Sequence, residues 1–321
     1  MPRTPRFTAY TLVFPPGCAG YVFGQYGFQT DAAEKAEHRA SAAAGAFTGA
    51  HAPDVLDRGS FTDSAGRYNA VWYAYWLAPA AHRRWVAAGG RKRARAGVPP
   101  LAGHWWEEAT VPVGAQSALQ THRTADFPVR GLASVLPQRV QDIHDYWGAV
   151  RDRIPIPDRT VHAAPTVRVR RRGESVHLSV DGGLCVIRTA QDWTLSTVYR
   201  DRFLQDVAPV MRRGVDYLQQ HPADSGCVAA RDVREHDAHG TPLERASVLA
   251  WFDSLQAMLD WTRDHPIYEA FFEMLGTDGT PLDVALWNEV ATLPPGSVTA
   301  AYTHCHDRTG FLPLLGEGTL R

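Results

Sequence analysis

The 321-residue sequence lacks several features that would place it in a broad class of proteins. No apolar run approaches the roughly 18 residues that a membrane-spanning helix needs. The N-terminus has neither a sustained apolar core nor a small-residue cleavage site, so no secretory signal is expected. Only four cysteines occur, far apart and without CxxC spacing, which argues against a disulfide framework. We therefore expect a cytoplasmic protein with no membrane partner.

An excess of charge of one sign is also missing. Lys and Arg number 33 and Asp and Glu number 34, so the charge balance does not indicate a nucleic-acid partner. Basic runs at 89–97 and 168–173 lack interleaved aromatic residues, and we interpret them as solvated loops or strand ends. The hydrophobic content of 45% over this length predicts a sizeable core. No long linker divides the chain, so we expect one folding unit.

Two stretches of the sequence are similar to one another. Residues 69–85 and 245–261 each place an apolar strand before a helix, and at a constant offset three alanines and a tryptophan coincide. A further strand follows each stretch, at 104–113 and 285–294. This pattern indicates an internal repeat.

The repeat predicts an α+β fold. We expect ferredoxin-like pseudo-repeats at about 20–112 and 226–300 within a single domain over 1–321. Two such units whose antiparallel sheets face one another form a barrel of the dimeric α+β type, with space for a large ligand between sheet and helices. Between the units we expect helices at 139–155 and 199–221 and a strand pair formed by 166–180 and 183–193.

A lone histidine, His265, stands where a helix is expected to begin. Pro266 suits the first turn of that helix. Three apolar side chains then recur at helical spacing: Ile267, Phe271 and Met274. The imidazole therefore borders an apolar wall. On these residues alone, His265 is either a hydrogen-bonded cap or a ligand of a cofactor.

Five blocks of the sequence resemble the haem-containing dehydratases typified by aldoxime dehydratase. They read FTDSAGRYNAVWYAYWLAPAAHRRW, HDYWGAVRDRIP, GLCVIRTAQDW, WFDSLQAMLDWTRDHP and AYTHCHDRTGFLPLL. They run from about residue 20 to 315 in the order of that family. The resemblance implies a haem enzyme with an α+β barrel.

The resemblance also implies where the haem lies. A haem b would sit between sheet and helices with its iron bound by His265, and it would be held non-covalently because CxxCH is absent. Apolar side chains would line it: Leu255, Leu259, Ile267, Phe271 and Met274. A rival cluster, His304, Cys305 and His306, matches a segment that is not the axial ligand in the family, so we interpret it as structural.

The resemblance places Arg188 on the distal side, where it would hold a substrate oxygen; the alternative is a salt bridge with Asp192. The distal histidine of the family is replaced here by Asn288. The distal serine and glutamate align with Ala229 and near Ala118. A general acid contributes roughly 10²–10⁴ in rate, and asparagine has no ionisable proton to supply.

The sequence thus predicts a haem-dependent lyase that acts on a small molecule with an N–O bond, with aldoxime to nitrile as the nearest chemistry. Arg188 and Asn288 are the expected catalytic residues. One alternative is diverged N–O or N–N chemistry in a biosynthetic pathway, such as nitrene-like transfer. Another is a non-catalytic haem-binding protein. We expect a monomer or a homodimer.

Overall fold

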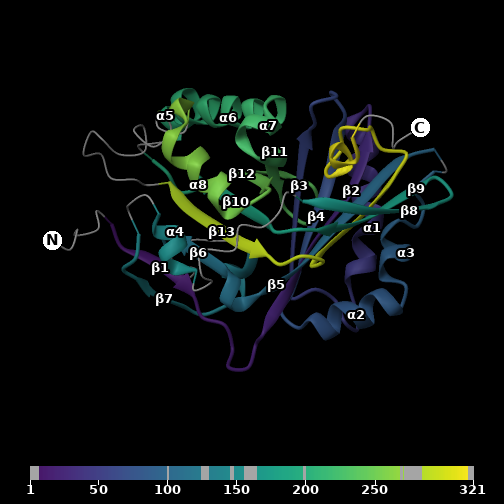
Figure 1. Ribbon diagram of the computed structural model, residues 1–321, viewed down its shortest axis with the longest axis horizontal. Helices are drawn as coiled ribbons and strands as arrows, with labels where there is room; N and C mark the ends of the chain where they lie inside the picture. Colours follow the sequence, from purple (N-terminus) through teal and green to yellow (C-terminus); the bar gives the residue numbers. More distant parts are fainter. Residues whose placement is uncertain are drawn as a thin grey trace.

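A computed structural model describes residues 7–99, 101–123, 130–144, 148–154, 165–197, 200–267, 270 and 284–316. Within these residues one antiparallel sheet of 14 strands forms the frame (Figure 1), in the order β7-β1-β6-β13-β10-β12-β11-β3-β4-β2-β5-β14-β9-β8. Helices pack on this sheet, so the predicted α+β class with antiparallel strands is confirmed. No helix among the described residues is long and apolar enough to cross a membrane.

Residues 20–112, here called the first unit, follow the order strand, helix, strand, strand, helix, strand. The elements are β2 (Gly20–Thr30), α1 (Ala33–Ala43), β3 (Val55–Thr62), β4 (Tyr68–Trp76), α2 (Pro79–Ala87), α3 (Gly90–Ala94) and β5 (Gly103–Pro112). Their strands lie in the sheet as β3-β4-β2-β5.

Residues 184–293, here called the second unit, repeat that order. The elements are β10 (Leu184–Asp192), α5 (Arg200–Arg202), a π-helical turn η4 (Phe203–Val207), α6 (Ala208–Gln220), α7 (Pro222–Ser225), β11 (Cys227–His236), β12 (Pro242–Phe252), α8 (Leu255–Asp264) and β13 (Ala285–Leu293). Their strands lie as β11-β12-β10-β13, so β12 and β10 correspond to β4 and β2. The similar stretches 69–85 and 245–261 are therefore β4–α2 and β12–α8.

The remaining elements extend the sheet at both ends. They are β1 (Ala9–Leu12), β6 (Gln116–Gln120), β7 (Gln138–Gln141), α4 (Ala149–Arg153), β8 (Thr166–Arg172), β9 (Ser175–Asp181), β14 (Val298–Thr303) and the 3₁₀ turns η1 (Ala44–Phe47), η2 (Val113–Ala115), η3 (Gly131–Ser134) and η5 (Leu312–Leu315).

Two predictions about this middle part of the chain are wrong. The helix expected at 139–155 is strand β7 followed by the short α4, because the backbone of β7 pairs with β1 at the edge of the sheet. The stretch 166–180 is itself a hairpin, β8 with β9, whose turn holds Gly173 at φ +56°, whereas β10 pairs with β12 and β13. The helix expected at 199–221 is confirmed. Its π-helical turn precedes Pro209, which has no N–H to donate to the preceding turn.

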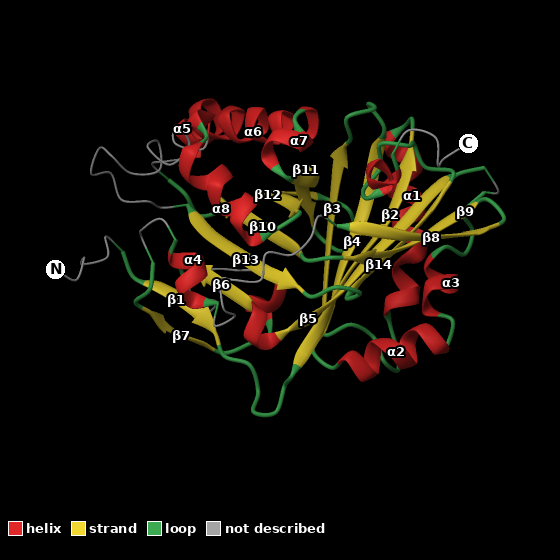
Figure 2. Cartoon of the chain, in the orientation of Figure 1, coloured by secondary structure: helices red, strands yellow, loops and turns green. Residues whose placement is uncertain are grey.

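Side chains alternate along each strand, so the sheet has two faces. The inner faces of both units share one core, in which Tyr73 and Tyr75 of β4 join Leu249 and Trp251 of β12. Helices cover the outer faces, α1 to α3 over the first unit and α6 and α8 over the second (Figure 2). The site described next lies on the outer face of the second unit.

Candidate active site

His265 follows the last residue of α8, in an extended conformation that separates α8 from the helical residues beginning at Pro266. The side chain of Ser254 caps the start of α8 by accepting a hydrogen bond from the Ala257 amide at 3.0 Å. The His265 ring lies 4.2 Å from the Tyr217 ring and 4.1 Å from the Trp261 ring, measured between centroids. Two aromatic side chains from α6 and α8 thus hold the imidazole in place.

The electrostatic setting favours the neutral form of this imidazole. Partial burial, and then the nearby His221, lower the pKa of His265. Its Nδ1 accepts a hydrogen bond from the Ile267 amide at 3.4 Å, so in the neutral ring the proton is on Nε2. A neutral imidazole is suited to bind iron, but binding through Nε2 requires the other tautomer and the loss of that contact.

Some of the apolar side chains expected to line a haem can be placed near His265. Leu259 is buried and Leu255 is half-buried, and both belong to the cluster between α6, α8 and the outer face of β10, β12 and β13. Ile267 is half-buried. Phe271 and Met274, which were expected in the same wall, lie outside the described residues.

Asn288 belongs to a row of outer-face side chains across four neighbouring strands. This second-unit row consists of Asn288, Thr189, Val248 and Asp232, on β13, β10, β12 and β11 in turn. The Asn288 Oδ1 atom is buried and has no hydrogen-bond partner among the described residues. A buried amide oxygen of this kind is costly to leave unpaired.

An arginine lies near the edge of this outer face. Arg153, the last residue of α4, donates from Nε to Ser117 Oγ at 2.7 Å. Ser117 pairs with Val290 across β6 and β13, and Val290 faces outward two residues from Asn288. A guanidinium and a hydroxyl therefore stand beside the second-unit row.

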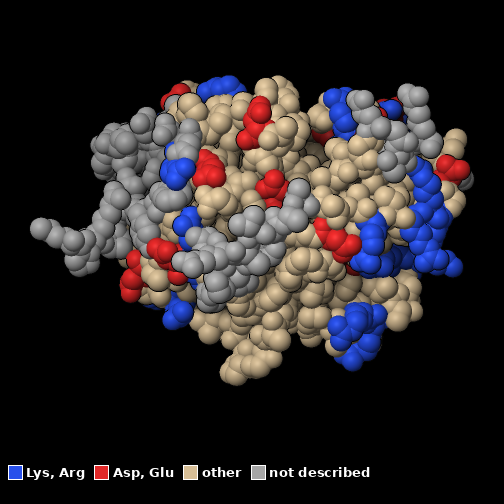
Figure 3. Space-filling view, viewed as in Figure 1, with Lys and Arg blue, Asp and Glu red and all other residues tan. Residues whose placement is uncertain are grey.

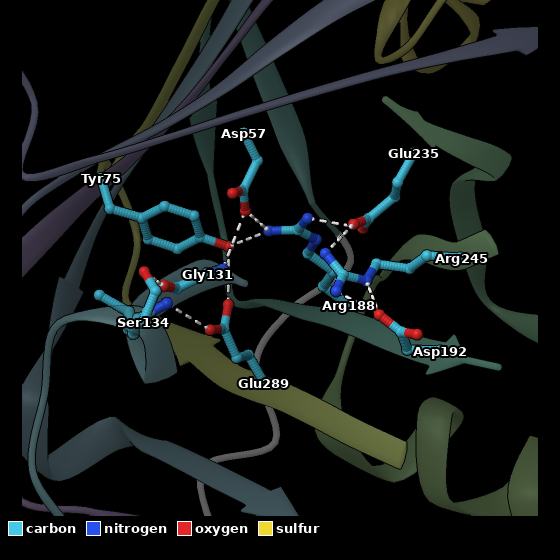
Figure 4. A network of polar contacts seen from close by, with 10 residues as sticks. Asp57, Tyr75, Gly131, Ser134, Arg188, Asp192, Glu235, Arg245 and Glu289 are labelled. Carbon is cyan, nitrogen blue, oxygen red and sulfur yellow. Dashed lines mark hydrogen bonds and ion pairs between the residues drawn. The ribbon is translucent and has the colours of Figure 1, made fainter. Parts of the chain in front are cut away.

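Arg188 lies on the opposite, inner face, as Figure 4 shows. Its side chain is 2% exposed and donates to Asp57 at 2.9 Å, to Glu235 at 2.7 Å and to the Tyr75 hydroxyl at 3.0 Å. Burial opposes the charged form, yet Tyr75, Glu235 and Asp57 together raise the pKa of Arg188. These groups accept hydrogen bonds from both terminal nitrogens of the guanidinium, and they join the two units.

Glu289 completes this inner network. It accepts from the Tyr75 hydroxyl at 2.6 Å and from the Leu132 amide at 2.9 Å, and burial raises its pKa. The adjacent Gly131 amide donates to Asp57 at 2.9 Å. Gly131 has φ +64°, and a Cβ there would lie 2.4 Å from a Glu289 oxygen. Only glycine therefore suits this turn.

The structure does not bring the expected distal residues together. Arg188 pairs with Glu289 on the inner face, whereas Asn288 pairs with Thr189 on the outer face. Ala229 and Ala118 also pack against the inner core. The expected grouping of these positions with Asn288 is thus wrong, because residues one apart on a strand face opposite ways.

Thr189 and Arg153 were missed by the sequence reasoning. A signal for Thr189 was available, because strand alternation places it on the face opposite to Arg188 and therefore with Asn288 once the register is known. Arg153 had no such signal, since the segment before it was expected to be a long helix. The alternative partner of Arg188, Asp192, instead pairs with Arg245, and Figure 4 shows that pair beside Glu235.

The rival cluster near the C-terminus serves the fold. Cys305 donates to the His104 carbonyl oxygen at 3.3 Å, and burial raises the pKa of its thiol to about 12. The His306 amide donates to Gln29 at 2.8 Å. Among the described residues, no group of three or more His, Cys, Asp or Glu side chains is placed to hold a metal ion.

Comparison with known proteins extends over nearly the whole chain. A family profile described as haem-containing dehydratase matches residues 23–311. The phenylacetaldoxime dehydratase of Bacillus sp. (strain OxB-1) is 28% identical over 97% of this chain and 92% of its own length. An aliphatic aldoxime dehydratase of Pseudomonas sp. is 28% identical over 83% of this chain and 78% of its own.

A solved structure has the same fold. An aldoxime dehydratase crystallised with butyraldoxime superposes with a TM-score of 0.87 at 22% identity, covering 96% of this chain and 89% of that one.

Proposed function

The chain belongs to the family of haem-containing dehydratases, and from that premise we propose that it is a haem-dependent lyase acting on a small molecule with an N–O bond. Conversion of an aldoxime to a nitrile is the nearest chemistry, because the curated relatives named above are dehydratases of aldoximes. In this proposal the haem is of the b type and is held without covalent attachment. His265 is its iron ligand.

The main support for this proposal is the difference between the outer faces of the first and second units. Four residues of the first unit are equivalent to the second-unit row. They are Trp106, Tyr26, Trp72 and Arg58, here called the first-unit row. Three of those four side chains are aromatic, and Trp72 donates to the Ala40 carbonyl oxygen of α1 at 2.8 Å. The second unit has asparagine, threonine and valine at the equivalent places. The smaller side chains suit a face that accepts a large planar cofactor beneath α6 and α8.

The residues present fit a haem in three respects. The lowered pKa of His265 favours its neutral form, the apolar cluster that includes Trp261 stands beside it, and the unpaired Asn288 oxygen lies on the outer face of the second unit. When bound, haem would supply an iron centre for the substrate nitrogen. Thr189 and Asn288 can each donate one hydrogen bond to a departing oxygen, and Arg153 can add charge beside them.

The proton for the departing oxygen has another source. Neither Thr189 nor Asn288 has a proton that ionises near neutral pH. Asp232 is the ionisable member of the second-unit row, and burial raises its pKa although Arg212, 3.4 Å away, opposes the shift. We propose Asp232 as the proton donor on this face.

The absence of a distal histidine also favours a second candidate function. With asparagine at 288, the haem could serve diverged N–O or N–N chemistry that needs no strong acid at that point. The two units are interpreted in both cases as tandem ferredoxin-like repeats in one domain, the second beginning at residue 184 rather than at about 226.

One experiment separates the two functions. Purified protein reconstituted with ferrous haem is given aliphatic and aryl aldoximes, and nitrile is measured by chromatography. The lyase proposal expects nitrile from at least one aldoxime. If the wild type makes none, Asn288→His should produce it, because position 288 belongs to the second-unit row. Ala229→Ser is the matched control and should not, because Ala229 packs against the inner core. If neither the wild type nor Asn288→His makes nitrile, the dehydratase proposal is overturned.

A further inference from the structure

A pocket of about 400 Å³ lies on the outer face of the sheet at the first unit. Strands β2, β5, β14, β9 and β8, which neighbour one another in this order, supply its floor, and the chain from Gly89 to Arg95 supplies a wall. This size is that of a small-molecule site. The apolar cluster beside His265 belongs instead to the second unit.

The lining of this pocket is cationic. Four side chains with a permanent positive charge contribute to it: Arg91, Lys92, Arg95 and Arg172. Among the described residues that line it, none is acidic. Figure 3 shows Lys and Arg gathered on the side of the molecule where α3, β8 and β9 lie. Such a concentration of one charge favours an anionic ligand.

One of these cations is held rigidly. Arg91 donates to Glu108 from Nε at 2.8 Å and from a second nitrogen, and its guanidinium lies 3.9 Å from the centre of the Trp106 ring. Glu108 is buried behind the pocket and also accepts from the Tyr26 hydroxyl at 2.7 Å. Although burial opposes it, donation by Arg91 and His82 lowers the pKa of Glu108 to about 2. The acidic group thus orients the arginine without entering the pocket.

Two histidines in the lining respond to the same positive field. Burial lowers the pKa of both His104 and His177, and neighbouring cations lower it further. Those acting on His177 are Arg172, Arg91, Arg170 and Arg95, and those acting on His104 are Arg95, His304 and Arg39. The floor also carries neutral donors, since Ser175 and Thr303 lie 2.7 Å apart through their hydroxyl oxygens.

We propose that this pocket binds a small organic phosphate, an anion with a compact ring or apolar body, at a site separate from the haem-dependent one. Arg95, Lys92 and Arg172 bind the phosphate, while Phe28, Trp106 and Val86 contact the body. Charge-assisted hydrogen bonds from arginine are strong and suit phosphate geometry. The proposal does not depend on the reaction at His265.

Titration calorimetry of the full chain tests it with three probes. AMP carries both phosphate and ring, inorganic pyrophosphate lacks the ring, and adenosine lacks the phosphate. We expect AMP to bind at least about tenfold more tightly than adenosine, and more tightly than pyrophosphate. Arg95→Gln combined with Arg172→Gln should weaken AMP binding by about tenfold or more. The control combines Arg83→Gln with Arg213→Gln, which removes the same charge outside the pocket lining. It should change the affinity for AMP by less than about twofold.

An NMR measurement distinguishes a defined phosphate site from general attraction by the positive charge of this surface. A bound phosphate favours the charged imidazoles, so AMP should raise the pKa values of His104 and His177 measured by NMR. The proposal is overturned if AMP and adenosine bind alike, if no heat is released with AMP, or if both double variants weaken AMP equally. A single-stranded oligonucleotide that binds more tightly than AMP also overturns it, because an open basic surface then explains the charge.

Discussion

The two units share their strand order and their inner core, but they use their outer faces differently. In the first-unit row the aromatic side chains fill the space under the helices: the Tyr26 ring lies 5.1 Å from Phe47 and 5.4 Å from Trp85. In the second-unit row the side chains are shorter, and the Asn288 amide oxygen has no hydrogen-bond partner among the described residues. Aromatic packing thus closes the outer face of the first unit, whereas in our proposal the outer face of the second unit holds the haem. Substitutions in the shared inner core or on either outer face test this difference between the units.

The largest effect is expected in the inner network that both units share. Arg188→Met leaves Asp57 and Glu235 buried without their shared cation, which should lower the free energy of unfolding by about 3–5 kcal/mol. The measurement is urea denaturation of the protein without haem.

Arg263→Met is the matched control for this change. Arg263 forms a pair with Asp260 at 3.3 Å in which both side chains are about half exposed, so its removal should change the free energy of unfolding by less than about 0.5 kcal/mol. Equal effects of the two substitutions would show that the inner network does not join the units.

Exchange of the two rows tests the comparison directly. Val248→Trp gives the second unit the residue that the first unit has at the equivalent place, and the added ring should weaken haem uptake by about a hundredfold. Hemin titration measures this. The reciprocal Trp72→Val removes packing and the hydrogen bond to Ala40, which should lower the free energy of unfolding by about 3 kcal/mol. Uptake of hemin by Val248→Trp at the wild-type affinity would refute the assignment of the face.

Gly131→Ala is expected to have an intermediate effect on the inner network. The positive φ and the 2.4 Å approach to Glu289 should together cost about 2 kcal/mol of unfolding free energy. Gly114→Ala is the control, because a Cβ there meets no atom within 4 Å, and it should change stability by less than about 0.5 kcal/mol. Thermal melts of the two variants measure the difference.

The smallest effect concerns pH. His104, His177 and His265 have lower pKa values in the folded chain than in the unfolded chain, whose ordinary value is about 6.5. As the pH falls below that value the unfolded chain binds protons first, so the free energy of unfolding should decrease. The full contribution is present above about pH 6.5. Urea titrations between pH 7.5 and 5.5 measure the slope, which His177→Gln should reduce; a rise in stability on acidification contradicts this expectation.

Much of the fold could be predicted from local patterns. The strand–helix stretches at 69–85 and 245–261 were recognisable because both periodicity and the repeat indicated them. The helix expected at 139–155 failed because β7 is only four residues long and owes its conformation to pairing with β1, a distant partner that local propensity does not reveal.

The candidate site was less predictable for a related reason. The proposed roles of His265 and of the leucines of α8 depend on a single helix, so they could be put forward from local sequence. The neighbours of Asn288 depend on the register between β13 and β10, and a shift by one residue reverses the faces. Resemblance alone therefore grouped Arg188 with Asn288, although the two side chains lie on opposite faces.

A single spectrum tests the central claim, that His265 binds the iron of a haem on the outer face of the second unit. The purified chain is titrated with hemin, and the Soret band is recorded for the wild type, His265→Ala and His306→Ala. The account predicts uptake of one haem, with a band that is lost or shifted in His265→Ala and retained in His306→Ala. A wild type that does not take up hemin, or a His265→Ala protein with the wild-type spectrum, contradicts it.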